Sequence, residues 1–376
     1  MVKHYVKLYP VDNGDCALIK LSNGKTIIID SQIREVTEDN KNDVYDVKAD
    51  LLKELAKDSE GRPFVDLFIS THPHSDHCVG FDENFYHGKL ENYDDKKDKD
   101  KIVVGELWIT PMGLSDDIDT PAVPIRQEAK RRRTLYDEDE DYKGEYGSYL
   151  RIVGYDKDKE FDSRYGYVPG TEVTKVNGGS LKYLRMFIHA PFKESVEEGK
   201  NTNKKNKVSV VVQHSFKKED GTVVCKLLTG GDAEHDVWEK ILENNQVGSD
   251  LDWNIFEAPH HCSWTFFNDS GNDEVCQAAE DILNHQIGYK ADIVTSCKSI
   301  EPDDKQAPPP SYKAMKEYKK SLKGGSEHFR NTSDEFKSSN EPLVYEINDY
   351  GKVKKIYIKS TVQTVVQKPA PRAGMK

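Results

Sequence analysis

The sequence predicts an α/β domain in which two mixed β-sheets pack face to face and helices cover both outer faces, an αββα sandwich. Short apolar runs with the character of buried strands alternate with amphipathic helical patterns along the chain. The chain has 376 residues, 36% of them hydrophobic, which is enough material for one large core. We expect the domain to span residues 1–362, with an insertion at about 86–180 and a flexible tail at 363–376.

The N-terminal segment is predicted to open the domain as an antiparallel meander. Residues 4–11 and 16–21 have the alternation of strands, and Asp12-Asn13-Gly14-Asp15 between them is a strong turn signal. Asn23-Gly24 then predicts a second turn, which leads into a third strand at 26–30.

The rest of the chain continues the alternation of strands and helices. The predicted strands cover 65–70, 103–110, 184–189, 208–214, 222–229, 254–258, 291–296, 343–348 and 352–358. The predicted helices cover 47–57, 125–135, 233–243, 274–284 and 311–322. The polar segment 193–207 and the charge run 91–101 are predicted to be loops, and 137–170 has no assigned structure.

Composition and charge exclude some classes of protein. The formal net charge of −12 argues against tight non-specific binding of nucleic acid, which usually needs a basic protein. It does not exclude a nuclease, because metal ions supply local positive charge at a phosphodiester. No apolar stretch approaches the roughly 20 residues of a membrane span, and the N-terminus has no secretory signal. The six cysteines are scattered without a CxxC pair, so we expect no disulfide framework and a cytoplasmic protein.

A cluster of metal-ligand residue types follows the predicted strand 65–70. His72, His74, Asp76 and His77 lie within six positions. An extended loop places alternate side chains on one side, so the first three converge and His77 adds a fourth donor from the following turn. Imidazole nitrogens with a carboxylate suit zinc, and also manganese or iron. Ordinary surface histidines are the alternative, and they do not explain so dense a pattern.

Two more predicted strands end in ligand-type side chains. One delivers Asp232 after Gly230-Gly231, whose lack of side chains lets the backbone pass close to another group. A carboxylate there can bridge two metals, and the alternative is a cap for the helix that follows. The other strand ends in Pro259-His260-His261-Cys262-Ser263. One of these histidines is predicted to bind metal and the other to orient it or contact substrate, and the residues leave open which is which.

The pattern His72-x-His74-x-Asp76-His77, followed by Asp232 and His261, resembles the metallo-β-lactamase superfamily. Three flanking segments resemble the branch typified by the nuclease-like domain of the competence protein ComEC. These segments are Val11 to Ala17 with Ile29-Asp30, Asn206-x-x-Ser209-Val210-Val211 ahead of Leu227 to Glu234, and Pro259 to Ser263. The resemblance covers roughly residues 4–360 and implies the αββα metallo-β-lactamase sandwich.

The resemblance also implies a ligand set for two divalent metal ions, zinc or alternatively manganese. His72 and His74 would bind the first ion, Asp76, His77 and His261 the second, and Asp232 would bridge them. Many superfamily members have a further histidine ligand, and His189 lies at about the right place. It is also interpretable as a strand-end residue without a metal. Cys262 replaces the glycine that is usual in this branch. Pro308-Pro309-Pro310 stands where the branch usually has a histidine, which leaves the identity of the substrate open.

These features predict a metal-dependent hydrolase, a phosphodiesterase or nuclease that uses a metal-bridged hydroxide held near Asp76. His260 is the predicted second catalytic residue, and it shares the candidate role of leaving-group partner with Lys298 and His328. The alternatives are a hydrolase of another ester class (thioester, lactone or β-lactam) and a non-catalytic metal-binding regulatory module.

The expected partner is nucleic acid or another phosphodiester substrate. Basic clusters at 130–133, 204–207 and 316–323 are candidates to line a groove, although a solvated helix face also explains the last of them. Aromatic residues are candidates to stack on bases, namely Trp264, Phe266, Phe267 and Tyr318. The sequence predicts no membrane association and identifies no protein partner.

Overall fold

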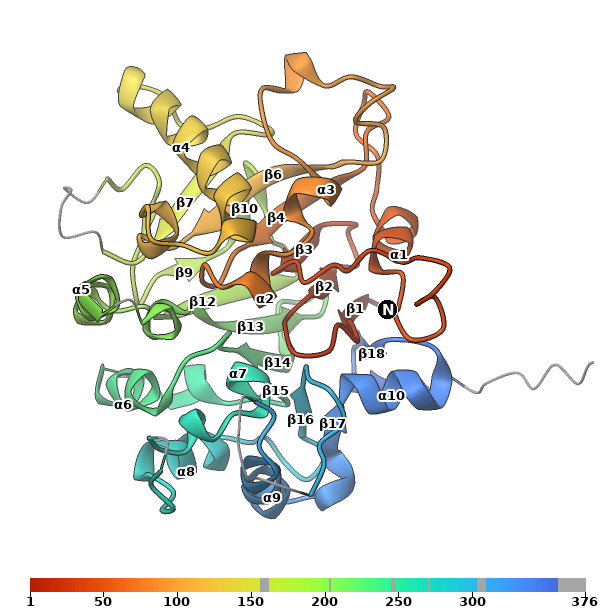
Figure 1. Ribbon diagram of the computed structural model, residues 1–376, viewed down its shortest axis with the longest axis vertical. Helices are drawn as coiled ribbons and strands as arrows, with labels where there is room; N and C mark the ends of the chain where they lie inside the picture. The colour runs from red at the N-terminus through yellow and green to blue at the C-terminus, as the bar shows by residue number, and fades with distance from the viewer. Residues whose placement is uncertain (156–161, 203, 245–247, 270, 303–308, 358–376) are drawn as a thin grey trace, which may run out of the picture.

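The protein is an αββα sandwich of two mixed sheets flanked by helices (Figure 1). The computed structural model describes residues 1–155, 162–202, 204–244, 248–269, 271–302 and 309–357. The predicted tail at 363–376 lies outside these residues. Every described helix is too short or too polar to cross a membrane.

The first sheet contains the N-terminal meander and is closed by the C-terminal hairpin. Its strand order is β19-β18-β1-β2-β3-β4-β6-β7-β8, with β5 paired to β6. Pairing is antiparallel from β19 to β3 and parallel from β3 to β8. The strands are β1 (Lys3–Leu8), β2 (Ala17–Lys20), β3 (Thr26–Ile29), β4 (Phe64–Ile69), β5 (Phe85–Tyr86), β6 (Ile102–Ile109), β7 (Tyr149–Val153), β8 (Gly166–Tyr167), β18 (Leu343–Asn348) and β19 (Gly351–Lys354).

The second sheet has the order β17-β16-β15-β14-β13-β12-β9. Its β14 to β17 are parallel to one another, and its other pairs are antiparallel. The strands are β9 (Glu172–Val173), β12 (Leu184–Ala190), β13 (Val211–Lys217), β14 (Val223–Thr229), β15 (Ile255–Glu257), β16 (Asp292–Thr295) and β17 (Phe329–Asn331). A separate small hairpin consists of β10 (Lys175–Val176) and β11 (Gly179–Ser180).

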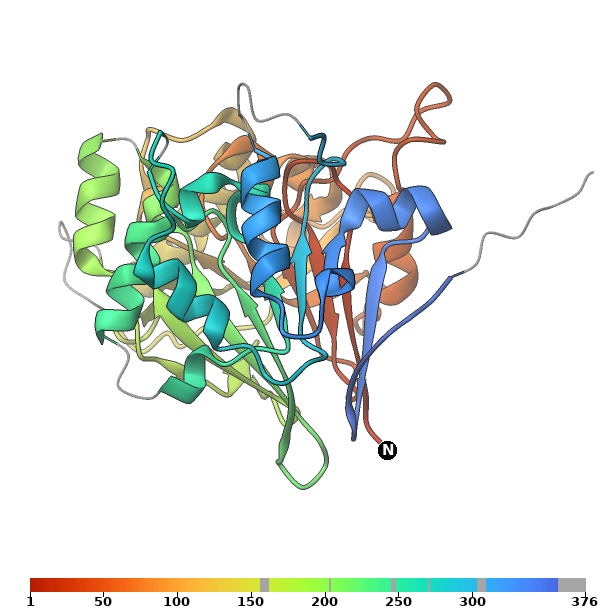
Figure 2. The ribbon, with the colours of Figure 1, turned by 90° about the horizontal axis from the view of Figure 1, so that it is seen from below.

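The helices cover the outer faces of the two sheets, as Figures 1 and 2 show. The helices are α1 (Val47–Glu54), α2 (Ser75–Cys78), α3 (Phe81–Asn84), α4 (Val123–Glu138), α5 (Lys193–Thr202), α6 (His235–Asn244), α7 (Pro259–Cys262), α8 (Gln277–Asn284), α9 (Tyr312–Ser321) and α10 (Thr332–Ser339). Of these, α1, α3 and α4 pack on the first sheet, and α6, α8 and α9 pack on the second.

Three apolar clusters correspond to the three interfaces between these four layers. The central cluster lies between the sheets and includes Ile27 and Trp108 from the first sheet and Leu227 from the second. A second cluster joins the first sheet to α1, α3 and α4, and a third joins the second sheet to α6, α8 and α9. Each buried strand is therefore apolar on both faces, which explains why continuous apolar runs predicted these strands correctly.

The structure corrects one element and supplies others that the sequence pattern did not assign. The predicted loop 193–207 is wrong, because Lys193–Thr202 forms α5. Its only large apolar residue, Val196, is fully buried against Met112 and Val208, so the helix lacks the wide apolar stripe that would have predicted it. The unassigned stretch 137–170 contains β7 and β8, which extend the first sheet. None of the six cysteines, all of which the structure describes, is in a disulfide.

Strand ends from both sheets meet at one edge of the sandwich. The loops that follow β3, β4, β14 and β15 all leave from this edge because these strands run parallel within their sheets. Hydrogen bonds tie these loops together. The amide of Val210, ahead of β13 of the second sheet, donates to the carbonyl of Thr71, and the amide of Asp15 donates to the carbonyl of Asp76 within the first sheet (both 3.1 Å). The predicted ligand residues lie on these loops.

A buried arginine joins α4 to the first sheet. Arg132, 1% exposed, donates to Glu128 Oε1 at 2.7 Å and to the carbonyls of Val104 and Tyr149, both at 2.8 Å. Within the basic run 130–133, Arg132 is therefore a structural cation rather than a surface charge, and Glu128 compensates the cost of burying it.

We predict that Arg132→Met lowers the free energy of unfolding by about 3 kcal/mol, because it leaves buried carbonyls and part of Glu128 without a donor. Arg133→Met on the same helix is the matched control. Arg133 forms an ion pair with the half-exposed Asp137 at 3.5 Å, so its replacement should change the stability by less than about 0.5 kcal/mol. Chemical denaturation measures both variants, and equal losses would contradict the structural role of Arg132.

Candidate metal centre

The loop after β4 is held in place by a buried carboxylate. Asp30, at the end of β3, accepts hydrogen bonds from the Thr71 amide at 2.8 Å and the Thr71 hydroxyl at 2.6 Å. Asp30 Oδ2 also lies 2.8 Å from His77 Nδ1. Because a carboxylate can only accept, Nδ1 of His77 carries a proton, and in the neutral form of the ring Nε2 carries the lone pair.

Asp232 lies at the centre of the site and presents its two oxygens to different histidines. Its Oδ2 is 3.4 Å from His72 Nε2, which in turn lies 3.0 Å from His74 Nδ1. Its Oδ1 is 3.1 Å from His77 Nε2 and 3.4 Å from His261 Nε2. The structure therefore divides the donors into two sets that share one carboxylate.

Asp76 belongs to the second set. Its Oδ2 is 3.3 Å from His261 Nε2, and its Oδ1 is 4.0 Å from His77 Nε2. By these contacts the second set contains the imidazoles of His77 and His261 and the carboxylates of Asp76 and Asp232. Asp15 also groups with His77, His261 and Asp232, while the first set contains His72, His74 and the other oxygen of Asp232. The ligand assignment that the resemblance implies did not include Asp15, and it stays a prediction.

Three buried atoms of the second set have no hydrogen-bond partner within the described chain. These atoms are His77 Nε2, His261 Nε2 and Asp232 Oδ1, and all three face one another. A buried polar atom without a partner is destabilising by about 1–3 kcal/mol, so three at one point indicate that another group satisfies them. Imidazole nitrogens and a carboxylate oxygen at this spacing fit a divalent cation of the zinc or manganese type.

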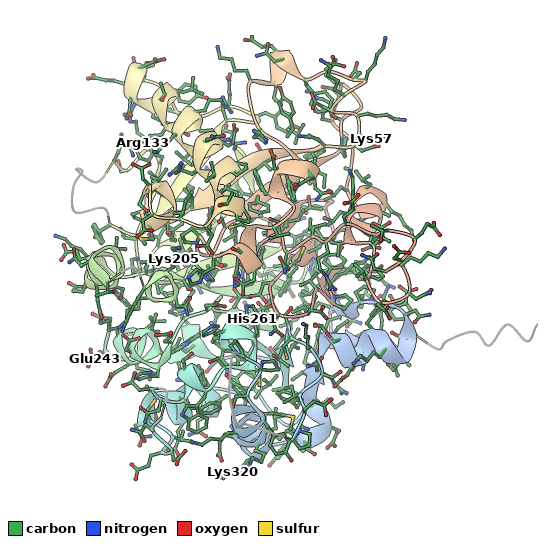
Figure 3. All side chains as sticks on the ribbon, in the orientation of Figure 1. Lys57, Arg133, Lys205, Glu243, His261 and Lys320 are labelled. Carbon is green, nitrogen blue, oxygen red and sulfur yellow. The ribbon has the colours of Figure 1, made fainter. Side chains whose placement is uncertain are left out.

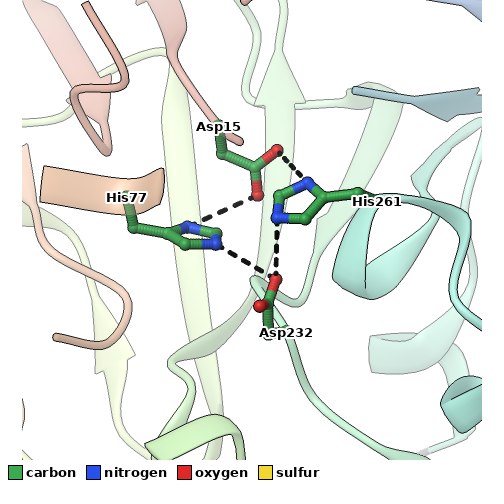
Figure 4. Close-up of side chains that lie close together, drawn as sticks. All are labelled: Asp15, His77, Asp232 and His261. Atoms are coloured by element: carbon green, nitrogen blue, oxygen red, sulfur yellow. Dashed lines mark ion pairs between the residues drawn. The ribbon is translucent and has the colours of Figure 1, made fainter. Parts of the chain in front are cut away.

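Asp15 is a further buried carboxylate that the sequence pattern identified only as part of a turn. Its oxygens lie 3.7 Å from His77 Nδ1 and 3.6 Å from His261 Nδ1. Figure 4 shows Asp15 and Asp232 on opposite sides of the two imidazole rings. Asp15 therefore faces the ring nitrogens that point away from Asp232, and it stabilises the orientation of both rings electrostatically.

The metal-free site has strongly perturbed proton affinities. Burial alone would raise the pKa of Asp232, but the surrounding histidines hold it well below its ordinary value. Burial opposes the charging of His261, yet Asp232 and Asp15 raise its pKa to about 9, and the pKa of His77 is raised well above its ordinary value by Asp232 and Asp30. Binding of a cation at the Nε2 atoms must therefore displace protons.

Buried carboxyl groups are concentrated at the site. Asp15, Asp30, Asp232 and Glu257 are buried, whereas the side chain of Asp76 is 37% exposed. Burial raises the pKa of Asp15 to about 6, and burial with the neighbouring Asp15 and Asp30 raises the pKa of Glu257 well above its ordinary value. The negative charge that is buried here needs compensation, which the surrounding histidines or a bound cation can supply.

The segment with the two adjacent histidines is a left-handed turn. His260, His261 and Cys262 have φ of 51°, 52° and 66°, a conformation that costs L-residues of order 1–3 kcal/mol each. Hydrogen bonds hold it: the His260 amide donates to the Gly231 carbonyl at 3.0 Å, and the Ser311 amide donates to the Cys262 carbonyl at 2.9 Å. The turn brings both imidazoles to Asp232, with His260 Nε2 3.7 Å from Oδ2.

The other predicted site residues differ in position. His260 lies at the side of the first set, with Nδ1 3.0 Å from the Thr265 hydroxyl. His189 is in neither donor set, and its Nε2 instead lies 2.9 Å from the Asp250 carbonyl. His328 contacts the buried Asp292 at 2.7 Å. The backbone amide of Lys298 contacts Asn13, and its side chain is exposed.

The structure does not support one continuous basic and aromatic groove. Phe266, Phe267 and Tyr318 are fully buried in the core beneath α9, so their predicted stacking on bases is wrong. Arg133 and Lys320 lie near opposite ends of the molecule in Figure 3, well away from His261, whereas Lys205 lies closer to it. Of the three basic clusters, only 204–207 adjoins the metal centre.

A cavity of about 470 Å³ opens beside His74. Lys205 at its wall is anchored by Asp119 at 2.7 Å, and Asp119 also accepts from the Ser75 amide at 2.8 Å, so the lysine and the histidine loop are fixed together. Lys204 is exposed and forms no ion pair with the residues the structure describes. The remaining lining residues are Asn206, Glu234, His235, Thr265 and Asp269.

Comparisons with known proteins add little to this geometry. No family model matches the sequence, and no curated protein matches it either. Among solved structures, the crystal structure of unliganded yeast PDE1 is similar at 13% sequence identity, over 88% of this chain and 97% of that chain, with a TM-score of 0.40. A TM-score this low does not support transfer of function.

We predict that the wild-type protein, equilibrated with zinc or manganese and then desalted, retains two ions per chain, whereas Asp232→Asn retains at most one. The substitution removes the charge that both donor sets share. Elemental analysis by inductively coupled plasma mass spectrometry measures the ratio. Asp236→Asn is the control, because Asp236 lies on the adjacent helix and pairs with Lys207 instead. Two ions bound to Asp232→Asn would show that this carboxylate is not shared.

Proposed function

We propose that this chain is a metal-dependent hydrolase of the metallo-β-lactamase superfamily that cleaves phosphodiesters, with nucleic acid as a candidate substrate. The observation that carries the proposal is the bridging position of Asp232, whose two oxygens lie at 3.4 Å and 3.1 Å from histidines of two different donor sets. A pair of cations held by one carboxylate is the arrangement that many phosphatases and nucleases use.

The proposed ligands follow from the two donor sets. His72 and His74 would hold one cation, Asp76, His77 and His261 the other, and Asp232 both. When bound, zinc or manganese ions would supply a nucleophilic water of lowered pKa and would polarise the phosphoryl oxygens. The histidines would contribute their neutral forms, and Asp30 fixes the tautomer of His77 for this purpose.

Three polar side chains of the site remain accessible to a substrate, namely those of His74, Asp76 and His260. The side chain of Asp76 is 37% exposed and that of His260 is 19% exposed, whereas His72, His77, His261 and Asp232 are at most 2% exposed. Asp76 is therefore placed to orient the attacking water and accept its proton. His260, held through Thr265, is placed to donate a proton from Nε2 to the leaving oxygen.

The cavity beside His74 supports a phosphodiester over an uncharged ester. Lys204 brings an exposed cation to it, whereas Lys205 is paired with Asp119. Of its two acids, Asp269 lies 3.9 Å from His235, and Glu234 accepts from the neutral amide of Asn206 at 3.3 Å and keeps its charge. Lys204 is thus available to a phosphoryl oxygen, and a β-lactam or thioester has no such anionic centre at the bond that breaks.

We predict that the zinc- or manganese-loaded protein hydrolyses bis-p-nitrophenyl phosphate, and that EDTA abolishes the activity until metal is restored. His72→Ala should lower kcat/KM by at least 10³-fold, because it removes a ligand of the first cation. Release of p-nitrophenol at 405 nm is the readout, and His87→Ala, distant from the site and paired with Asp82, is the control. Turnover of nitrocefin or a thioester without turnover of the phosphodiester would assign the other ester class, and turnover of none would favour a regulatory module.

We predict a separate signature for His260. His260→Gln should lower kcat more for phenyl than for p-nitrophenyl phosphodiesters, by roughly tenfold or more, because the poorer leaving group needs the proton. The steady-state kcat for the two leaving groups measures this difference, and metal content must stay unchanged. An equal loss for both leaving groups would exclude proton donation by His260 and would favour a role in binding the first cation.

A further inference from the structure

A second cavity, of about 590 Å³, lies where β12 meets α5 and α6. Figure 1 shows these three elements beside one another at the margin of the second sheet. The strand contributes Phe187 and His189, α5 contributes Lys193, and α6 contributes Ile241 and Asn244. A cavity of this size is within the range of small-molecule sites, and none of the residues that line it belongs to the metal centre.

His189 presents an unused acceptor in this cavity. The residue is 4% exposed, and its Nε2 lies 2.9 Å from the carbonyl of Asp250, which can only accept. The proton is therefore on Nε2, and Nδ1 carries a lone pair. Within the described ranges, no group donates to Nδ1. Burial lowers the pKa of His189 to about 4, so the ring is neutral at physiological pH.

The walls of the cavity suit a flat apolar ring without net charge. The ring of Phe187 lies edge-on to His189, with centroids 4.9 Å apart, and Phe192 and Ile241 add apolar surface. The carboxylate of Asp250 is neutralised by Arg185 at 2.8 Å. Lys193 and Glu194 at the rim carry opposite charges. Neither sign of charge therefore predominates, which disfavours an ionic ligand.

We propose that this cavity binds a neutral planar heterocycle of nucleobase size, which donates a hydrogen bond to His189 Nδ1 and packs its ring against Phe187 and Phe192. Aromatic walls with one oriented polar atom give shape and orientation together. The site is distinct from the metal centre and does not depend on the proposed hydrolase activity.

The test uses matched probes that differ only in the donor. Indole and adenine have ring or exocyclic N–H groups, and 1-methylindole and 6-dimethylamino-9-methylpurine are their methylated counterparts without any N–H. Saturation-transfer NMR and a titration with each probe give the dissociation constants on the metal-loaded chain of 376 residues. We expect at least one N–H probe to bind in the millimolar range or tighter, and methylation to weaken it at least fivefold.

Three variants locate the binding. His189→Phe keeps a ring but removes the acceptor, so it should weaken the N–H probe at least fivefold. His189→Gln provides an amide donor for Asp250 and an amide oxygen acceptor, so it should restore most of the affinity. Asn244→Trp at the exposed rim narrows the cavity without changing His189, and it should weaken the probe even if the histidine variants unfold. His87→Phe is the control and should bind as the wild type does.

Binding that is indifferent to methylation and to all three variants would overturn the proposal. Absence of binding for both N–H probes up to 10 mM would overturn it as well. Hydrolysis of bis-p-nitrophenyl phosphate is measured on the same samples. A protein that hydrolyses the phosphodiester but binds neither probe would therefore refute this site alone.

Discussion

The two-sided position of the Asp232 carboxylate is the constraint on which the rest of the site depends. The backbone just before Asp232 passes close to the loop after β4, and this close approach requires a glycine at position 231. Gly231 has φ +49°, and a Cβ on it would lie 2.9 Å from the hydroxyl oxygen of Thr71. The Asp232 amide donates to the Ser209 hydroxyl at 3.1 Å, which fixes the backbone. With Asp232 fixed in this way, histidines of both sets contact the same carboxylate.

The sandwich architecture stabilises the protein enough to hold these donor side chains together. Loops from both sheets supply the donors, so each side chain is positioned by a rigid strand end rather than by a long flexible segment. The site concentrates four buried carboxyl groups and a left-handed turn of three residues, both of which destabilise a metal-free fold. Burial of the large apolar clusters on both sheets offsets this destabilisation.

Local sequence spacing predicted the parts of the site that are local in space. His72, His74, Asp76 and His77 are close because they share one loop, and the strand-end positions of Asp232 and His261 follow from the parallel strand pattern. Asp15 could not be found in this way, because a carboxylate in Asp12-Asn13-Gly14-Asp15 has a sufficient explanation as a turn residue. Its role depends on a contact with a residue almost 250 positions away.

Other differences have the same origin in tertiary packing. Arg132 belongs to a basic run that is typical of a surface, yet Glu128 and three strand carbonyls bury it. The aromatic residues near α9 are core residues, which spacing alone cannot distinguish from an exposed stacking surface. The direction in which His189 leaves its strand depends on the register of β12 with β13, which contains an irregularity between Ile188 and Ala190.

Anomalous diffraction from crystals soaked in zinc or manganese tests the central claim most directly. Two peaks should appear, one contacted by His72 and His74 and one by His77 and His261, each in contact with a different oxygen of Asp232. A single peak, or peaks that do not contact Asp232, would contradict the shared-carboxylate site and the hydrolase that we infer from it.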